Sequence, residues 1–302
     1  MKEPSWNNDD SENGKICLSN AKELFFSNIQ LAVKYSELAI DYLEKDDKSL
    51  CDLAHCYYIK ACGLWQTNRE EANLYYVESI KKHILGSQTE SYKKNRFYKF
   101  VGIKNIQDID SILNRIRLIH PSNFNDPMDC PIASDSKNGI PNINLFNGLR
   151  VACFGIVDEK DYFLDASKWS YYGDFHRGIC IEYDFSHLHF NNKYSLIGKI
   201  KYEPQYIPNK GIVGSGLLTK SIDYIHENEW RIISYNEDLI SKDPEYIDIN
   251  SSVITKIYLG YKCSEDVKKY ISIFQRINPH IKVFQIQPSE ENFYKLSANE
   301  LL

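Results

Sequence analysis

The hydrophobic period of this chain changes once, and that change restricts its possible folds more than any other feature. From about Ser19 to Ile84, apolar residues recur every three to four positions, as they do on amphipathic helices. The stripes are carried by Leu24–Tyr42, Leu50–Trp65 and Ala72–Ile80. After the polar segment Gly86–Ser91 the apolar runs become short, which is typical of strands. The sequence therefore predicts helices first and a sheet afterwards.

The helical part has the spacing of paired helices that stack as repeats. Its segment Leu53–Lys82, with Ala72 and Tyr76 in the second helix, resembles a tetratricopeptide-type hairpin. Three helices are too few for a free-standing solenoid, so we expect a cap packed on the next domain. The alternative is a surface that binds a protein partner. We assign residues 16–86 to this unit and residues 1–15 to a disordered start.

The remaining chain, residues 92–302, alternates strands with few helices. Strands are expected at Arg96–Val101, Ile116–His120, Val151–Ile156, Gly178–Phe185, Lys199–Tyr202, Trp230–Tyr235, Val253–Leu259 and Ile281–Ile286, and helices at Asp108–Arg117 and Ser264–Arg276. Strands that outnumber the helices between them favour an α+β domain. We therefore predict an α+β fold, in which the helical repeat-like segment precedes a mixed, mostly antiparallel sheet.

Composition restricts the cellular compartment and the classes of partner that we expect for the protein. The net charge of -5 does not indicate a nucleic-acid-binding surface over the whole molecule. No apolar run reaches membrane-spanning length, and the acidic, Asn-rich start is not a signal peptide. The eight cysteines lack the paired spacing of a metal site and are typical of buried thiols in a reducing compartment. We expect a cytoplasmic protein with no membrane contact and no bound metal.

Four segments combine aromatic, charged and glycine residues. They are Phe124–Asp129, Trp169–Glu182, Lys220–Arg231 and Ile257–Gly260. They contain Phe-Asn-Asp-Pro-Met-Asp, Trp-Ser-Tyr-Tyr-Gly-Asp with Arg-Gly-Ile-Cys-Ile-Glu, Glu-Asn-Glu-Trp-Arg, and Ile-Tyr-Leu-Gly. In this order they resemble the bacterial family catalogued as domain of unknown function 2971, over about residues 97–296. Met128 stands where that family more often has Phe. The family name supplies no activity, so the chemistry has to be argued from the residues.

The turn Asn125-Asp126-Pro127 holds two polar side chains after an apolar strand. A residue before proline is held in extended geometry, so the turn is rigid. A rigid turn needs no further role. A turn at a strand end also presents polar groups at the rim of a sheet, where ligands bind. Asn125 and Asp126 are therefore candidate ligand contacts.

The segment Glu227–Arg231 is the strongest candidate for catalytic chemistry. On a strand, Glu227, Glu229 and Arg231 point to one face. An exposed ion pair is the ordinary alternative and contributes little. The segment continues into the apolar pair Ile232-Ile233, so we expect at least one acid to be semi-buried. A semi-buried carboxylate has a partner or a function.

The order of a basic strand around Lys99, an aromatic middle segment and a late Glu-x-Glu is similar to that of ADP-ribosyltransferases. The Ser-Thr-Ser motif and the early histidine of that class are absent. The resemblance implies NAD as the donor, with nicotinamide leaving while positive charge develops on the ribose. It implies Glu229 as the carboxylate that stabilises this charge, and Tyr172 or Trp169 as the stacking group. The remaining candidates are Arg177 or Lys99 at the diphosphate, Glu227 as a second catalytic acid, and Glu182, Lys220 and Arg231 as binding residues.

Two other interpretations stay open. His176 with Glu182 and Glu229 is typical of a hydrolase or nuclease, although no paired nuclease signature is present. In a non-catalytic binding module the same motifs would only build the sheet and its loops. The transferase interpretation predicts a bacterial toxin or defence effector, in which the helices bind a protein partner or regulate the enzyme.

Overall fold

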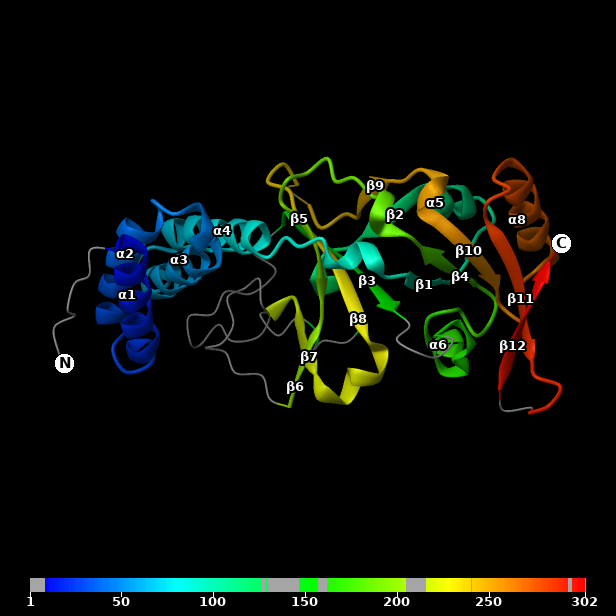
Figure 1. Cartoon of the computed structure of the whole chain (residues 1–302), viewed down its shortest axis with the longest axis horizontal. Coiled ribbons are helices and arrows are strands. Elements are labelled where there is room, and N and C mark those ends of the chain that lie inside the picture. Colours follow the sequence, from blue (N-terminus) through cyan, green and yellow to red (C-terminus); the bar gives the residue numbers. More distant parts are fainter. Residues whose placement is uncertain are drawn as a thin grey trace.

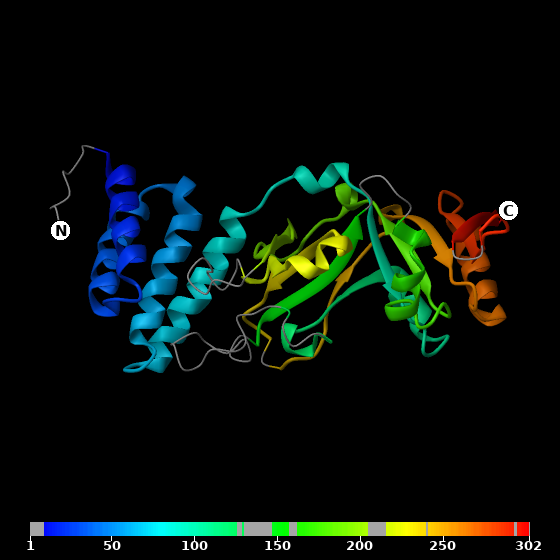
Figure 2. The same ribbon diagram turned by 90° about the horizontal axis from the view of Figure 1, so that it is seen from below.

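The computed structural model describes residues 9–125, 129, 147–156, 162–204, 216–239, 241–292 and 295–301. The molecule is elongated, with α1–α4 at one end, a long sheet through the middle, and α8 with β12 at the other end (Figures 1 and 2). The helices are α1 (Asp10–Leu24), α2 (Ile29–Leu43), α3 (Leu50–Leu64), α4 (Arg69–Gly86), α5 (Asp108–Asn114), α6 (Ala166–Tyr171) and α8 (Glu265–Ile277). The strands are β1 (Phe97–Val101), β2 (Arg115–Leu118), β3 (Leu149–Ile156), β4 (Ile179–Tyr183), β5 (Ser195–Lys199), β6 (Lys201–Glu203), β7 (Thr219–Ser221), β8 (Glu229–Tyr235), β9 (Glu245–Asp248), β10 (Ile254–Leu259), β11 (Lys282–Pro288) and β12 (Leu296–Leu301).

The N-terminal part consists of two helical hairpins, α1–α2 and α3–α4. Small residues lie where the helices approach closely: Ala21, Ala32, Ala39, Ala54, Ala61 and Ala72 are fully buried. This part has four helices and not the three predicted, because α1 (Asp10–Leu24) precedes the first predicted stripe. Most of that stripe is α2, which begins after Asn28, whose side chain accepts from the amide of Leu31. Helix α1 begins at Asp10, with the side chain of Asp9 as its cap, so residues 10–15 are helical and not part of a disordered start.

The main sheet has eight strands in the order β12-β11-β10-β4-β1-β3-β8-β5. All neighbours are antiparallel except β10 and β11, which are parallel and are joined through α8. Two small sheets, β2–β9 and β6–β7, lie beside it. The protein therefore has an α+β architecture with a mostly antiparallel mixed sheet, as predicted from the sequence. In the described part of the chain no helix is long and apolar enough to cross a membrane.

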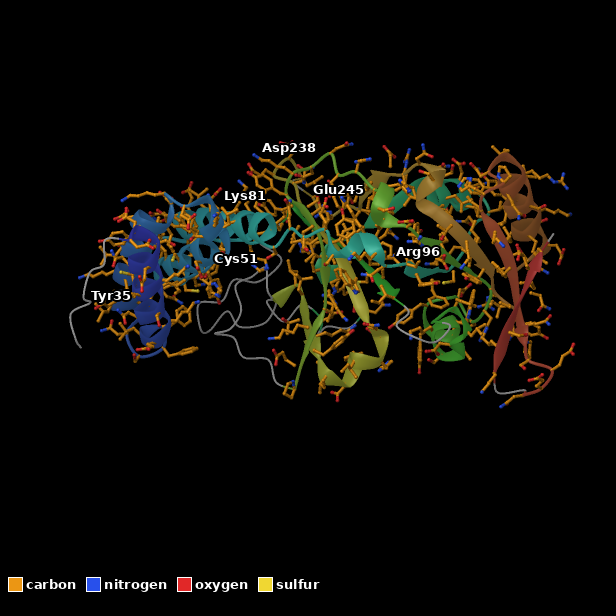
Figure 3. The ribbon with its side chains drawn as sticks, in the orientation of Figure 1. Tyr35, Cys51, Lys81, Arg96, Asp238 and Glu245 are labelled. Atoms are coloured by element: carbon orange, nitrogen blue, oxygen red, sulfur yellow. The ribbon has the colours of Figure 1, made fainter. Side chains whose placement is uncertain are left out.

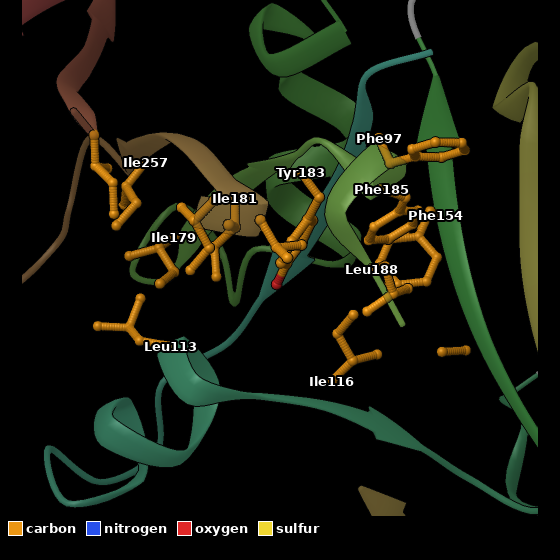
Figure 4. Close-up of a cluster of buried hydrophobic side chains, with 14 of the residues drawn as sticks. Phe97, Leu113, Ile116, Phe154, Ile179, Ile181, Tyr183, Phe185, Leu188 and Ile257 are labelled. Carbon is orange, nitrogen blue, oxygen red and sulfur yellow. The ribbon is translucent and has the colours of Figure 1, made fainter. Parts of the chain in front are cut away.

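One face of the sheet carries the aromatic and aliphatic core shown in Figure 4. Its members alternate along the strands, as in Ile179, Ile181 and Tyr183 of β4, with α5, β2 and α8 covering them. The ring of Phe97 stacks on Phe185 with centroids 4.5 Å apart. The opposite face holds polar residues in the middle of the sheet and packs against α6 and the N-terminal helices toward its two ends.

The sheet splits between β1 and β3. Along their described lengths these strands pair at two positions, Phe97 with Ile156 and Tyr98 with Gly155. Strand β1 then continues its pairing with β4 as far as Val101. On the other side, β3 leaves β1 and forms a bridge to Ile119, just after β2. The two strands therefore diverge and leave a wedge between them.

Candidate functional site

A cavity of about 710 Å³ occupies the wedge between β1 and β3. Its volume is in the range of small-molecule sites. The cavity reaches both sides of the sheet, because its lining includes neighbouring strand residues, and these point to opposite faces. Lys99 and Phe154 line it on the face covered by β2, whereas Cys153 and Glu229 line it on the other face.

One end of the cavity, the acidic end, is lined by Asp129, Glu227 and Glu229. A buried arginine of β8, Arg231, holds two of these acids in place. Arg231 is fully buried, and its Nε donates to Oε1 of Glu229 at 2.6 Å. Its Nη2 donates to both carboxylate oxygens of Asp129 at 2.7 and 2.9 Å, and its Nη1 donates to the carbonyl of Leu217. The rigid guanidinium fork thus fixes two carboxylates side by side. Glu229 and Arg231 share a face of β8, as the sequence predicts.

Lys220 of β7 connects these acids to Glu227. Its Nζ donates to Glu227 at 2.6 Å and to Glu229 at 3.1 Å, and it lies 3.4 Å from Asp129. Glu227 is not on the strand: it ends a short 3-10 helix (Ile222–Glu227), and Asn228 has a φ of 45°. This left-handed residue turns the chain, so Glu227 reaches the cluster although it lies outside β8.

Tyr172 closes the cluster toward solvent. Its hydroxyl donates to Oε1 of Glu227 at 2.9 Å, and its side chain is 47% exposed. The ring therefore borders the cavity while its hydroxyl orients one carboxylate. Asp129, Glu227 and Glu229 face the two cations Lys220 and Arg231, which leaves one excess negative charge in this part of the cavity.

Electrostatics keep Glu229 ionised. Burial alone would raise the pKa of Glu229, but Arg231 and Lys220 outweigh it and lower the pKa to about 2. Burial would likewise lower the pKa of Lys220, but Glu229, Asp129 and Glu227 raise it. The backbone amide of Glu229 donates to the hydroxyl of Tyr202, which also holds the start of β8 in place. Glu229 is thus a fixed anion across the neutral pH range.

The structure brings six of the predicted site residues to this cavity. They are Lys99, Asn125, Tyr172, Lys220, Glu227 and Glu229. Arg231 does not line the cavity, but it lies next to Glu229 and donates a hydrogen bond to it. Asp126 lies outside the described residues.

Four predicted residues lie elsewhere. Trp169 is fully buried in the core formed with α6, with its indole N–H donating to the carbonyl of Phe163, so it is not placed to stack on a ligand. His176 stacks on Trp169, and burial lowers its pKa. Arg177 is exposed and pairs with Asp174. None of these three residues lines the cavity.

Glu182 belongs to a separate buried network. It accepts from Tyr98 at 2.6 Å, from Thr255 at 2.7 Å and from Lys256 at 3.1 Å. Burial alone would raise the pKa of Glu182, but these hydrogen bonds lower it. Its partners satisfy it within the sheet, so Glu182 ties β4 to β1 and β10 and does not line the cavity.

Several cavity residues were not among the predicted ones. Asp129 could have been predicted from the sequence, because it ends the motif Phe124–Asp129, which also contains Asn125. Arg115 and Arg117 had a weaker signal, because they alternate with the buried Ile116 and Leu118 on β2. Their position beside the wedge depends on the split of β1 from β3, which no local pattern indicates.

The chain matches no protein-family model, and neither the curated proteins nor the solved structures contain a significant match to it. The chemistry of the site therefore rests on its own geometry.

Proposed function

We propose that the chain is a transferase of ADP-ribosyltransferase type that uses NAD as the donor substrate. The observation that carries the proposal is the carboxylate cluster at one end of a ligand-sized cavity, with Glu229 ionised and Tyr172 beside it. A fixed anion next to a ring suits a substrate that develops positive charge beside a flat leaving group. Membership of the domain family 2971 and a role as a toxin or defence effector remain predictions.

The bond between ribose C1′ and nicotinamide nitrogen breaks, and nicotinamide leaves with the electron pair. Glu229 stabilises the positive charge shared by C1′ and the ring oxygen, and Tyr172 packs against the leaving group. A hydroxyl, an amine or water forms the new bond to C1′ and gives its proton to Glu227. Lys220 keeps the two carboxylates apart and oriented.

The test is nicotinamide release from NAD, followed by chromatography, in the full chain and its variants. We expect Glu229→Gln to lower the rate at least about 100-fold, as loss of a charge-stabilising group does. Tyr172→Phe keeps the ring and removes the bond to Glu227, and we expect a reduction of about tenfold. Glu300→Gln is the matched control, because that carboxylate is exposed and pairs only with Lys282 among the described residues.

Retained thermal stability of the variants separates catalysis from folding. If the wild type releases no nicotinamide from NAD, the transferase proposal fails and the binding-module interpretation stands in its place. If Glu229→Gln and Tyr172→Phe both turn over NAD like the wild type, the roles assigned to Glu229 and Tyr172 are wrong. The hydrolase interpretation with His176 receives no support from the geometry, because His176 does not line the cavity that contains Glu229.

A further inference from the structure

The small sheet β2–β9 turns one face toward the cavity. Arg115 and Arg117 lie on that face of β2, because Ile116 and Leu118 between and after them are buried in the core. Tyr246 of β9 pairs directly with Arg117, so its side chain points to the same face. All three residues line the cavity. The ring of Tyr246 is 45% exposed and lies 5.9 Å from the guanidinium of Arg115.

This side of the cavity carries more positive charge than its own acids neutralise. Lys99, Lys104, Arg115 and Arg117 line it, with Asp108 as the acid among them. Arg115 pairs with Asp248, but both side chains are more than half exposed, so the pair holds weakly. Within the described residues, neither Lys104 nor Arg117 has an ion-pair partner.

Lys99 adds a further positive charge on this side of the cavity. Its Nζ donates to the carbonyl of Cys153 at 3.0 Å, whereas an ammonium has three protons to donate. Burial lowers the pKa of Lys99, and the positive charge of Arg117 lowers it further, although Glu229 acts in the opposite direction. A group of cations that outnumber the carboxylates beside them is stabilised by a bound anion.

We propose that the β2–β9 face is a subsite for the nucleoside diphosphate part of a ligand. Two arginines two residues apart on one strand are separated by roughly 7 Å, which lets their forks hold both phosphates of a diphosphate. Tyr246 beside them offers a ring on which a base can stack. The link to catalysis rests on the proposed function: a ribose that follows the diphosphate enters the end of the cavity that holds Glu229.

The experiment measures ADP binding to the full chain by calorimetry, at low and at moderate salt. We expect ADP to bind, and AMP to bind at least fivefold more weakly because it lacks the second phosphate. The double variant Arg115→Gln, Arg117→Gln is expected to weaken ADP binding at least 30-fold, and Tyr246→Ala about tenfold. Arg276→Gln, an exposed arginine on α8, is the matched control and is expected to stay within twofold.

Two conservative variants guard against a folding effect. Arg117→Lys keeps the charge but loses the fork, and we expect an intermediate affinity. Tyr246→Phe keeps the stacking ring, and we expect an affinity close to that of the wild type. If ADP does not bind, or if it binds the double arginine variant as well as the wild type, the subsite does not exist.

Glu229→Gln separates this inference from the proposed function. We expect it to bind ADP within threefold of the wild type while nicotinamide release is lost. If ADP binding depends on the arginines but the wild type releases no nicotinamide from NAD, the subsite stands and the transferase proposal fails. If Glu229→Gln loses ADP binding as fully as the arginine variants do, while the circular dichroism of each is unchanged, ADP binding is not specific to the β2–β9 face and the inference is overturned.

Discussion

At the scale of single residues, the acidic end of the cavity is organised by Arg231. Three of its nitrogens donate to two carboxylates and one carbonyl, and no part of its side chain is exposed. The phenyl ring of Phe124 covers the guanidinium with its centroid 5.4 Å away. A buried cation of this kind is tolerated because each of its three nitrogens donates a hydrogen bond and two carboxylates face it. Its removal would leave Glu229 and Asp129 as neighbouring charges with Lys220 alone between them.

Arg231→Met tests this role. Methionine fills a similar volume without charge, so the expected loss is that of breaking a buried pair, about 3–5 kcal/mol in the free energy of unfolding. Urea unfolding followed by circular dichroism measures it. The control is Arg276→Met on the exposed side of α8, which should change the same quantity by less than about 0.5 kcal/mol. An equal effect of both substitutions would mean that the cluster contributes no specific stability.

Part of this cluster was predictable from sequence. Alternation along a strand placed Glu229 and Arg231 on one face, and the apolar continuation of β8 predicted their burial. The contacts of Arg231 with Asp129, and of Lys220 with Glu227, join residues that only the fold brings together. Trp169 was misplaced by sequence reasoning because an aromatic residue in a core and one in a ligand site give the same local pattern.

At the scale of elements, most strands with an apolar run were predictable, and strands without one were not. Strands β3, β4, β8, β10 and β11 carry apolar runs, and each lies within two residues of its expected bounds or overlaps them closely. Strands β7, β9 and β12 were missed because their residues are partly or fully exposed, so they lack an apolar period. The strand predicted at Lys199–Tyr202 is wrong, because it spans the break between β5 and β6, and the buried β5 was missed. The missed pairing of β9 with β2 is what places Tyr246 at the cavity.

The hairpin α3–α4 carries a pH dependence. His55 and His83 are held largely out of water, and burial lowers the pKa of each to about 4. The unfolded chain takes up protons at these positions as the pH falls below about 6.5, whereas the folded chain does so only near pH 4. The stability that the neutral imidazoles provide is therefore present above pH 6.5 and is lost as the pH falls from about 6.5 to about 4.

The double variant His55→Gln, His83→Gln measures this contribution. A tenfold difference in proton affinity corresponds to about 1.4 kcal/mol. Because both rings keep some contact with water, we expect the pair to account for about 2–3 kcal/mol of the loss between pH 7 and pH 4. Unfolding free energies at several pH values, compared between wild type and variant, give the difference. Parallel pH profiles for the two proteins would contradict the prediction.

At the scale of the whole molecule, the N-terminal helices and the sheet share one hydrophobic core. Buried residues of α1–α4 form a continuous cluster with Leu149, Ile233 and Tyr235 of β3 and β8. Polar contacts reinforce the junction: Lys81 of α4 pairs with Glu237 after β8, near Asp238 (Figure 3), and Gln88 donates to the carbonyls of Lys193 and Ser195. The helices are thus a cap on the sheet, packed against the strands that carry Glu229 and Arg231.

This shared core predicts that helices and sheet unfold together. Hydrogen exchange followed by mass spectrometry over a urea series should show amides of α3 and of β4 losing protection at the same urea concentration. Tyr235→Ala opens the core at the junction and is expected to cost about 3–5 kcal/mol. With about 2–3 kcal/mol per M of urea, both regions should then lose protection roughly 1–2.5 M earlier. Tyr171→Ala, at a tyrosine that is 81% exposed, should leave both transitions in place.

The alternative outcome has a clear physical meaning. If α3 keeps its protection in Tyr235→Ala while β4 loses it, each part is stable without the other, and the helices are an independent unit joined by a linker. In that case a partner bound to the helices would have no mechanical route to the site. If both regions shift together, the free energy of the junction is shared by the whole chain. A ligand that binds the helical surface and changes the packing around Tyr235 would then change the position of β8, and with it Arg231 and Glu229.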